Sequence, residues 1–186
     1  MSQMTYNPNL LKSLIDINVI KTGDFILKSG IKSSIYIDLR LLLNEPSIIK
    51  EISYELYKKI EFNNLNISNT KLCGIPYGAL PFSCCLSTEF NIPQIIVRKE
   101  AKTYGTKKLI EGVFQEDDEL ILIEDIVTTG SSIIELIDKL KEYNLNIKQI
   151  IVIIDRSNNQ MENVKKLGYN ITSLFSIKDI NEILKV

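Results

Sequence analysis

The sequence of 186 residues contains no histidine and no tryptophan, and only three cysteines. The absence of histidine excludes Ser-His and Cys-His catalytic pairs and every metal site that needs an imidazole ligand. Acid–base chemistry must therefore depend on carboxylates, lysines, tyrosines or the substrate. Cys73, Cys84 and Cys85 are odd in number and two are adjacent, which favours free thiols in apolar surroundings, in a reducing compartment, over a disulfide framework.

Long apolar runs and an excess of one charge are also lacking. No uninterrupted apolar stretch could span a bilayer, and residues 1–9 are polar and do not resemble a secretory signal. These features predict a cytoplasmic protein with no membrane contact. The net charge of −1 gives no general attraction to nucleic acid, so any anion site must be local. Since no repeat, linker or change of composition appears, we expect one domain over residues 1–186.

Strand-like and helix-like segments alternate along the chain. The apolar strands read as buried on both faces, which predicts an open parallel α/β sheet whose ligands bind beyond the carboxyl ends of the strands. A closing helix, strand and helix are expected after residue 154. Strands are expected at residues 24–27, 34–38, 71–75, 94–97, 120–123 and 149–154, and helices at residues 8–19, from about 46, at 79–90 and at 132–143.

The most informative segment starts with the continuous apolar run 120–123 and ends where a helix is expected to begin. Two acids and two apolar residues lead into a turn rich in hydroxyl groups, made of Thr128, Thr129, Gly130, Ser131 and Ser132. Such a turn directs backbone N–H groups and a helix N-terminus at one point, which makes a phosphate site. Gly130 can adopt a positive φ angle and lets a phosphate approach the backbone.

The two acids, Glu124 and Asp125, are adjacent and are expected to point to opposite sides of the strand end. There they can hold sugar hydroxyls and steer a metal-bound pyrophosphate. The alternative is an ordinary helix cap after a strand that happens to end in acids, but capping explains only one or two of these polar residues. The segment is not a Walker A loop, since no Gly-Lys-Ser/Thr follows, and it lacks the spacing of a dinucleotide fingerprint.

This segment resembles the phosphoribosyl pyrophosphate signature of the type I phosphoribosyltransferases. Four further segments, in family order, resemble those of the orotate phosphoribosyltransferases. They are LKSG with SSIYIDLR (27–30 and 33–40), CGIPYGALP (73–81), RKEAKTYGTKKLIEG (98–112) and DR (155–156). The segment 98–112 is similar to the mobile catalytic loop in the form found in eukaryotic UMP synthases. Agreement of all five is far more specific than any one of them.

The resemblance implies an α/β type I phosphoribosyltransferase fold, with an open parallel sheet flanked by helices, a small N-terminal hood and a mobile catalytic loop. It implies an orotate phosphoribosyltransferase, which transfers the phosphoribosyl group of phosphoribosyl pyrophosphate to orotate. The products would be orotidine 5′-monophosphate and pyrophosphate, in de novo pyrimidine (UMP) biosynthesis. It also implies a homodimer in which the loop 99–111, hinged at Gly105 and Gly112, reaches the neighbouring subunit's site.

The charges of the two substrates agree with this resemblance. Phosphoribosyl pyrophosphate is a polyanion that needs Mg²⁺ and several basic side chains. Mg²⁺ is expected to be held mainly by the pyrophosphate and by Asp125 through water, with no direct protein ligand. The carboxylate of orotate needs a fixed cation, and Arg156 can supply a planar two-pronged donor.

The resemblance also assigns individual site residues. The expected catalytic residues are Lys99, Lys102 and Asp125. Phosphoribosyl pyrophosphate is expected to contact Lys28, Tyr77, Arg98, Lys99, Lys102, Glu124, Asp125, Thr128, Thr129, Gly130, Ser131 and Ser132. Orotate is expected to contact Tyr36, Ile37, Thr128 and Arg156, with the backbone around Tyr36 and Ile37 taking part.

Simpler structural roles stay open for three of these residues. Tyr36 alternates with apolar neighbours and can be a core residue of a strand. Tyr77 can be a turn residue packed on the sheet. Arg156 can pair with Asp155 or Glu162 at the start of a helix.

The loop departs from a common form of the family. Many bacterial members carry Asp-His-Gly where this chain has Thr103, Tyr104 and Gly105. Tyrosine there is the eukaryotic-type pattern, but threonine cannot act as a carboxylate, so no acid–base role is expected at Thr103. Lys107 and Lys108 are expected to be solvated surface lysines.

A second departure is the absence of the decarboxylase domain that follows this one in UMP synthases. We therefore expect decarboxylation on another protein, and association with a separate orotidine 5′-monophosphate decarboxylase is a hypothesis.

Two other functions are compatible with the phosphate site. A purine or uracil phosphoribosyltransferase would read a different base, and a phosphoribosyl pyrophosphate sensor that regulates transcription would need a basic patch or a DNA-binding domain. The sequence gives no sign of either of these last two features.

Overall fold

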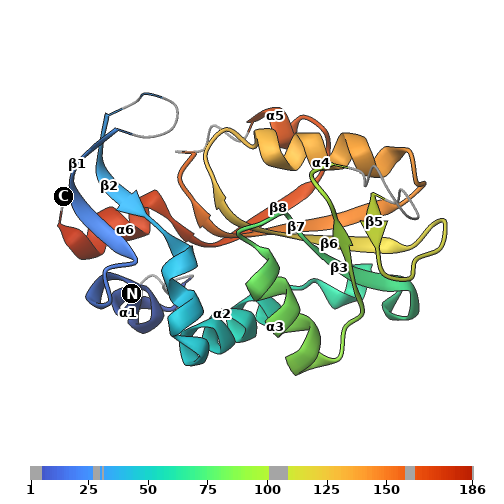
Figure 1. Cartoon of the computed structure of the whole chain (residues 1–186), viewed down its shortest axis with the longest axis horizontal. Coiled ribbons are helices and arrows are strands. Elements are labelled where there is room, and N and C mark those ends of the chain that lie inside the picture. The colour runs from blue at the N-terminus through green and yellow to red at the C-terminus, as the bar shows by residue number, and fades with distance from the viewer. Residues whose placement is uncertain (1–5, 27–29, 31, 101–108, 158–161, 186) are drawn as a thin grey trace.

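The computed structural model describes residues 6–26, 30, 32–100, 109–157 and 162–185, and its central feature is a six-stranded sheet (Figure 1). The strand order is β5-β4-β3-β6-β7-β8, and β1 and β2 form a separate antiparallel hairpin. The strands are β1 (Ile20–Ile26), β2 (Lys32–Ile37), β3 (Thr70–Gly74), β4 (Gln94–Val97), β5 (Ile110–Glu111), β6 (Glu119–Val127), β7 (Asn146–Asp155) and β8 (Asn170–Ser176). The helices are α1 (Pro8–Asp16), α2 (Pro46–Lys58), α3 (Leu80–Phe90), α4 (Ser131–Lys141), α5 (Glu162–Lys165) and α6 (Ile177–Leu184), with short 3-10 turns at Leu39–Asn44, Phe62–Asn64 and Ile67–Asn69.

The predicted parallel α/β sheet is confirmed, with one addition. Strands β3, β4, β6, β7 and β8 pair in parallel, whereas β5 pairs antiparallel with β4 at the edge of the sheet. Strand β5 was not predicted, because two residues inside a polar stretch give no period-two pattern. The hairpin β1–β2 matches the small N-terminal hood that the resemblance implies.

Among the boundaries that differ from the prediction, two have identifiable reasons. The first helix ends at Asp16 and not at residue 19, because Asn18 takes a left-handed conformation (φ 59°) and turns the chain into β1. Strand β6 continues past the two acids to Val127. Glu124 pairs with Val152 and Ile126 with Ile154 on β7, so both acids lie within the strand and not at its end.

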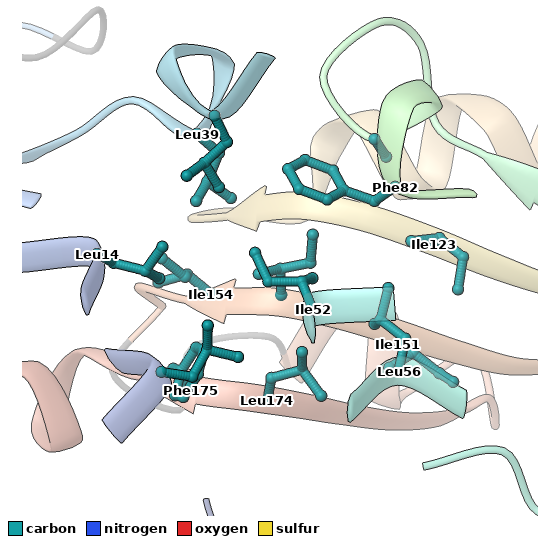
Figure 2. Packing of buried hydrophobic residues seen from close by; sticks show 14 of the residues in the cluster. Leu14, Leu39, Ile52, Leu56, Phe82, Ile123, Ile151, Ile154, Leu174 and Phe175 are labelled. Atoms are coloured by element: carbon teal, nitrogen blue, oxygen red, sulfur yellow. The ribbon is translucent and has the colours of Figure 1, made fainter. Parts of the chain in front are cut away.

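The core consists of two apolar clusters on opposite faces of the sheet. Ile121 and Ile123 of β6 face one cluster, which α1, α2 and α3 cover, while Leu120 and Leu122 face the other, which α4 covers. This alternation follows from the period of two along a strand. Figure 2 shows Ile123 beside Ile151 of β7, with side chains from α2 closing over them. Full burial of each such side chain stabilises the fold by about 1.5–3 kcal/mol.

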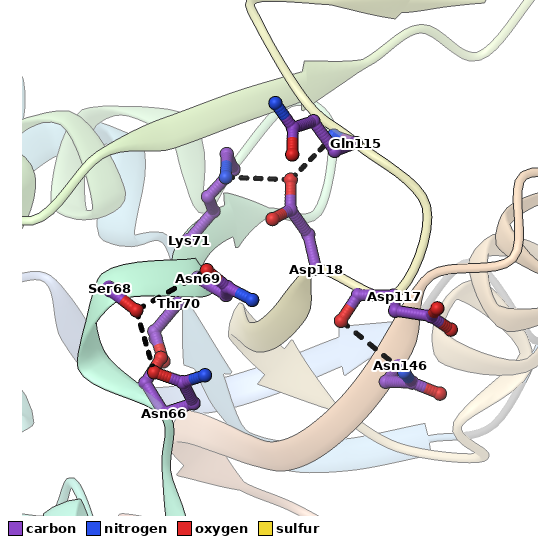
Figure 3. A network of polar contacts seen from close by, with 9 residues as sticks. All are labelled: Asn66, Ser68, Asn69, Thr70, Lys71, Gln115, Asp117, Asp118 and Asn146. Carbon is purple, nitrogen blue, oxygen red and sulfur yellow. Dashed lines mark hydrogen bonds and ion pairs between the residues drawn. The ribbon is translucent and has the colours of Figure 1, made fainter.

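The amino ends of the strands are fixed by polar contacts (Figure 3). Lys71 of β3 forms a buried 2.6 Å ion pair with Asp118, and the Gln115 backbone N–H also donates to that carboxylate at 2.7 Å. Burial alone would raise the pKa of Asp118, but these contacts outweigh it and the pKa is lowered. Asn146 of β7 reaches the Asp117 carbonyl nearby. The opposite edge of the sheet therefore remains for ligands.

The three thiols are free, as predicted. Cys73 is fully buried in β3, and burial raises its pKa to about 12, so it stays protonated and packs as a small apolar side chain. Cys84 and Cys85 are partly buried on α3. Within the described ranges, no helix is both long and apolar enough to cross a bilayer.

Candidate active site

The loops that follow β3, β6 and β7 meet at the carboxyl edge of the sheet. They are residues 75–79, 128–130 and 156–157, which lead into or toward α3, α4 and α5. Since β3 pairs with β6 and β6 with β7, the three loops are neighbours in space. Most of the predicted site residues that the structure describes lie on these loops, on β6 shortly before the second loop, or in the first turn of α4.

Glu124 lies on β6 and is nearly enclosed, with 5% of the residue exposed. Ser132 Oγ donates a 3.2 Å hydrogen bond to its carboxylate from the first turn of α4. Burial, followed by the hydrogen bond and charge of neighbouring Asp125, raises the pKa of Glu124 to about 9. Glu124 is therefore protonated at neutral pH in the ligand-free protein, and the two acids interact although they are adjacent on a strand.

Asp125 is partly exposed and lies against the turn 75–79. A Cβ atom at Gly78 would overlap the Asp125 carboxylate. The missing side chain at Gly78 thus lets the turn pass directly over Asp125. Strand pairing and this turn together aim one carboxylate at the open edge of the sheet while Glu124 stays enclosed.

The hydroxyl-rich turn has the geometry that its sequence predicts. Gly130 adopts φ 79° at the N-cap of α4, and a Cβ there would overlap Val164 of α5. Because the cap is a glycine, no cap side chain accepts an N–H group of the first helical turn, although the Ser131 N–H lies 3.4 Å from Thr129 Oγ1 in the same turn. Thr128 and Thr129 are exposed, and Thr129 Oγ1 lies 2.9 Å from Ser131 Oγ.

A row of cations borders the turn 75–79. Lys99 Nζ lies 4.8 Å from the centre of the Tyr77 ring, a cation–π distance, and Tyr77 is 66% exposed. Tyr77 is therefore not packed on the sheet, which was the alternative for this residue. Arg98 forms a 2.9 Å ion pair with Glu111 of β5. A pocket of about 370 Å³ lies between this turn and α4, lined by Ile75, Pro76, Arg98, Lys99, Ser132, Glu135, Leu136 and Lys139.

Arg156 connects the sheet to the hairpin. Its Nη2 atom donates to Ser33 Oγ at 3.1 Å and to the Ile35 carbonyl at 3.0 Å. Of the two alternatives, the pair with Asp155 does not form: Arg156 donates to the hairpin, and Asp155 Oδ1 accepts from the Ser157 backbone N–H. The side chain of Glu162, the other alternative, lies outside the described parts of the chain. Burial lowers the pKa of Arg156, and its hydrogen-bond partners here are both neutral.

The two hairpin residues predicted to contact orotate differ in exposure. Tyr36 is partly exposed and its ring lies 5.4 Å from that of Phe25. Ile37 is buried in the core and is paired with Ile20, so only its backbone could meet a ligand. Tyr36 thus points away from the face that carries Ile35 and Ile37, as the strand alternation requires.

Several predicted residues lie outside the described parts of the chain. They are Lys28, which lies between β1 and β2 in the sequence, and Lys102, Thr103, Tyr104, Gly105, Lys107 and Lys108 of the predicted catalytic loop. The ends of that loop are described. Arg98 N–H donates to the Leu109 carbonyl at 2.9 Å, next to the β4–β5 pair.

Three residues at this edge were not predicted. Gly78 gives room to Asp125, Ser33 holds Arg156, and Lys139 donates a 2.6 Å hydrogen bond to the Lys99 carbonyl. The glycine beside Tyr77 is a sequence signal for close approach of the backbone. The other two contacts join segments more than 30 residues apart, and no local pattern encodes them.

Comparisons with known proteins agree with this geometry. Residues 42–184 match the family model described as phosphoribosyl transferase domain. An orotate phosphoribosyltransferase of Pyrococcus abyssi is 39% identical over 173 residues, which cover 93% of this chain and 94% of the relative. The uridine 5′-monophosphate synthase of Bos taurus is 36% identical over 177 residues, 95% of this chain, but this chain spans only 36% of that protein.

A solved structure agrees as well. The crystal structure of orotate phosphoribosyltransferase from Aeropyrum pernix superposes with a TM-score of 0.79 at 26% identity, covering 95% of this chain and 99% of the other. The hood, the sheet order and the acidic strand are thus parts of a type I phosphoribosyltransferase fold. From the family model and from a relative matched along nearly its whole length, this chain belongs to the phosphoribosyl transferase family, among the orotate phosphoribosyltransferases.

Proposed function

We propose that this chain transfers the phosphoribosyl group of phosphoribosyl pyrophosphate to orotate, giving orotidine 5′-monophosphate and pyrophosphate in pyrimidine biosynthesis. Two relatives that are named as orotate phosphoribosyltransferases and align over nearly the whole chain support the reaction. The uridine 5′-monophosphate synthases are much longer than this chain, so the activities of those whole proteins are ascribed to this chain only within this proposal.

The observation that carries the choice of base is the state of Arg156. Its guanidinium is half buried, burial lowers its pKa, and it donates to a hydroxyl and a carbonyl. A half-buried cation whose partners among the described residues are neutral gains most from an anion placed beside it. The carboxylate of orotate meets that need, whereas uracil and the purines bring no such charge. Tyr36, the backbone of Ile37 and Thr128 would complete the base site.

The phosphate half of the site supports binding of the donor. The hydroxyls and N–H groups of residues 128–132 would hold the 5′-phosphate, and Glu124 and Asp125 the ribose hydroxyls. Tyr77, Arg98 and Lys99 would face the pyrophosphate, joined by Lys28 and Lys102. As the bond from the anomeric carbon to pyrophosphate breaks and the bond to the base nitrogen forms, these cations would stabilise the leaving group.

We propose Mg²⁺ as the cofactor of this reaction. Among the described residues no cluster of three or more potential metal-ligating side chains occurs. Asp125, however, has a partly exposed carboxylate at the carboxyl edge of the sheet. That donor set fits an ion carried mainly by the pyrophosphate and touched by Asp125 through water. Bound there, Mg²⁺ would neutralise charge on the leaving pyrophosphate.

The assembly and location are further parts of the proposal. We propose a cytoplasmic homodimer, with a single domain in each chain, in which the loop containing Lys102 serves the neighbouring site. We also propose association with an orotidine 5′-monophosphate decarboxylase, because several relatives are named as synthases or bifunctional enzymes. Sedimentation of this chain with that enzyme tests the association, and independent migration at micromolar concentration would count against it.

The reaction is tested by the Mg²⁺-dependent loss of orotate ultraviolet absorbance in the presence of phosphoribosyl pyrophosphate. Parallel reactions offer uracil, hypoxanthine and adenine. We expect turnover of orotate alone. Arg156→Ala should raise the KM for orotate about 10- to 100-fold, the range for a hydrogen bond to a charged group, with the KM for the donor nearly unchanged. Turnover of another base would keep the phosphate site and refute the assignment of Arg156. Binding of the donor without turnover of any base would favour a sensor.

A further inference from the structure

Lys139 makes a contact that links the phosphate helix to a cation of the site. Its ammonium donates a 2.6 Å hydrogen bond to the backbone carbonyl of Lys99. Lys139 lies near the end of α4, the helix whose first turn carries Ser131 and Ser132. Lys99 follows β4, forty residues earlier in the chain. The contact thus fixes the backbone of Lys99 relative to the helix that begins at the phosphate turn.

The position of Lys139 on the helix determines how it can act. Ser132, Glu135 and Lys139 follow one another at helical spacing and line the same pocket beside Lys99. At a rise of about 1.5 Å per residue, Lys139 lies roughly 10 Å along the axis from Ser132. A 5′-phosphate held at the N-terminus of α4 is therefore far from the Lys139 backbone, and the contact that the structure gives the Lys139 ammonium is with the Lys99 carbonyl.

Lys99 is held at both of its ends. Lys139 donates to the backbone carbonyl of Lys99, and the Lys99 ammonium lies 4.8 Å from the centre of the Tyr77 ring. The preceding residue, Arg98, is bound to Glu111 and to the Leu109 carbonyl. A cation that is placed in advance of ligand binding loses less conformational entropy when the pyrophosphate arrives.

We propose that Lys139 is a positioning residue, which orients Lys99 for the pyrophosphate group of the donor and of the product. This inference rests on the proposed function, because it takes Lys99 as a pyrophosphate ligand. In this proposal Lys139 acts through the Lys99 backbone and not on a reacting atom. Its loss should weaken pyrophosphate recognition and leave recognition of the base alone.

The test compares Lys139→Met with Lys139→Arg and with Lys141→Met. Methionine keeps an unbranched stem but cannot donate, arginine can, and Lys141 is an exposed lysine on the same helix that pairs with Asp138. We expect Lys139→Met to raise the KM for phosphoribosyl pyrophosphate, and the Kd of Mg²⁺-pyrophosphate measured by calorimetry, about three- to tenfold, the range of one hydrogen bond. The KM for orotate should change less than twofold, Lys139→Arg should restore most of the loss, and Lys141→Met should match the parent.

A double-mutant cycle with Lys99→Met tests whether Lys139 acts through Lys99. If it does, Lys139→Met adds no further loss once the Lys99 ammonium is gone. Additive losses, an unchanged Kd for pyrophosphate in Lys139→Met, or an equal rise in both KM values with a lowered melting temperature would overturn the proposal. Failure of the parent to consume orotate would refute the proposed function instead, and the calorimetric arm would still decide the role of Lys139.

Discussion

Replacing Glu124 by glutamine should stabilise the ligand-free protein, and the gain should grow with pH. Burial and Asp125 raise the pKa of Glu124 from its ordinary 4.5 to about 9. The folded state therefore keeps a proton that the unfolded chain releases above pH 4.5. Between these two values, rising pH lowers the free energy of unfolding by up to about 1.4 kcal/mol per pH unit. Glutamine has nearly the same shape, still accepts from Ser132 and does not titrate.

The size of the effect follows from the environment of Glu124. From pH 5 to pH 8 the limit is about 4 kcal/mol, at about 1.4 kcal/mol per unit. Asp125 is partly exposed, so water reaches this edge of the sheet and screens an ionised Glu124. Screening by water reduces the cost, and we expect the variant to gain roughly 2 kcal/mol over the parent across this pH range.

Urea unfolding at pH 5, 6, 7 and 8, without Mg²⁺ or substrates, measures this difference. Subtracting the parent from the variant removes the titration of all other groups. Glu116→Gln, at an exposed turn position, serves as the control for the substitution itself. Parallel pH dependences for the parent and Glu124→Gln would show that Glu124 is already ionised when folded, and the reasoning from burial would be wrong.

Three further predictions concern other parts of the structure. Gly78→Ala places a Cβ where the Asp125 carboxylate lies. The kcat/KM for phosphoribosyl pyrophosphate should therefore fall at least about tenfold, which is the effect of losing one charged contact. Steady-state rates near those of the parent would contradict this placement of Asp125. Lys71→Met leaves Asp118 buried without its cation, so the free energy of unfolding measured in urea should fall by about 3 kcal/mol. The double variant with Asp118→Asn should recover part of that loss. No recovery would mean that lost packing, and not an unpaired charge, is responsible. Chelation of Mg²⁺ should abolish orotate turnover, and Asp125→Asn should raise the Mg²⁺ concentration needed for half-maximal rate; turnover in excess chelator would refute the proposed cofactor.

The sequence predicted the fold best where local pattern and burial agree. The run 120–123 alternates its side chains between two covered faces, and this requires a strand in the middle of a sheet. Strand β5 escaped prediction, because its two residues form a strand only through pairing with β4. The acids were placed at a strand end for a similar reason, since only the partner strand β7 extends the ladder to Val127.

The site was predictable in its residue types and less so in its contacts. The phosphate turn was recognisable because a glycine and several hydroxyls occur together between a strand and a helix. The partners of Arg156 could not be recognised in the same way. The nearest acids in the sequence, Asp155 and Glu162, were the candidates, whereas the structure places Ser33 of the hairpin beside Arg156. Contacts between distant segments depend on the packed fold and leave no local trace.

The short pair of β4 and β5 has a consequence for how this family can vary. Ile96 pairs with Glu111 and Val97 with Ile110, and Arg98 and Leu109 are joined by a backbone hydrogen bond. Whatever sequence lies between residues 100 and 109 thus leaves the sheet and returns to it at adjacent points. Closing a longer segment across such a junction costs only about 0.6 kcal/mol for each doubling of its length. We therefore expect that this segment can be replaced by the corresponding loop of a relative and that the rest of the protein will fold in the same way.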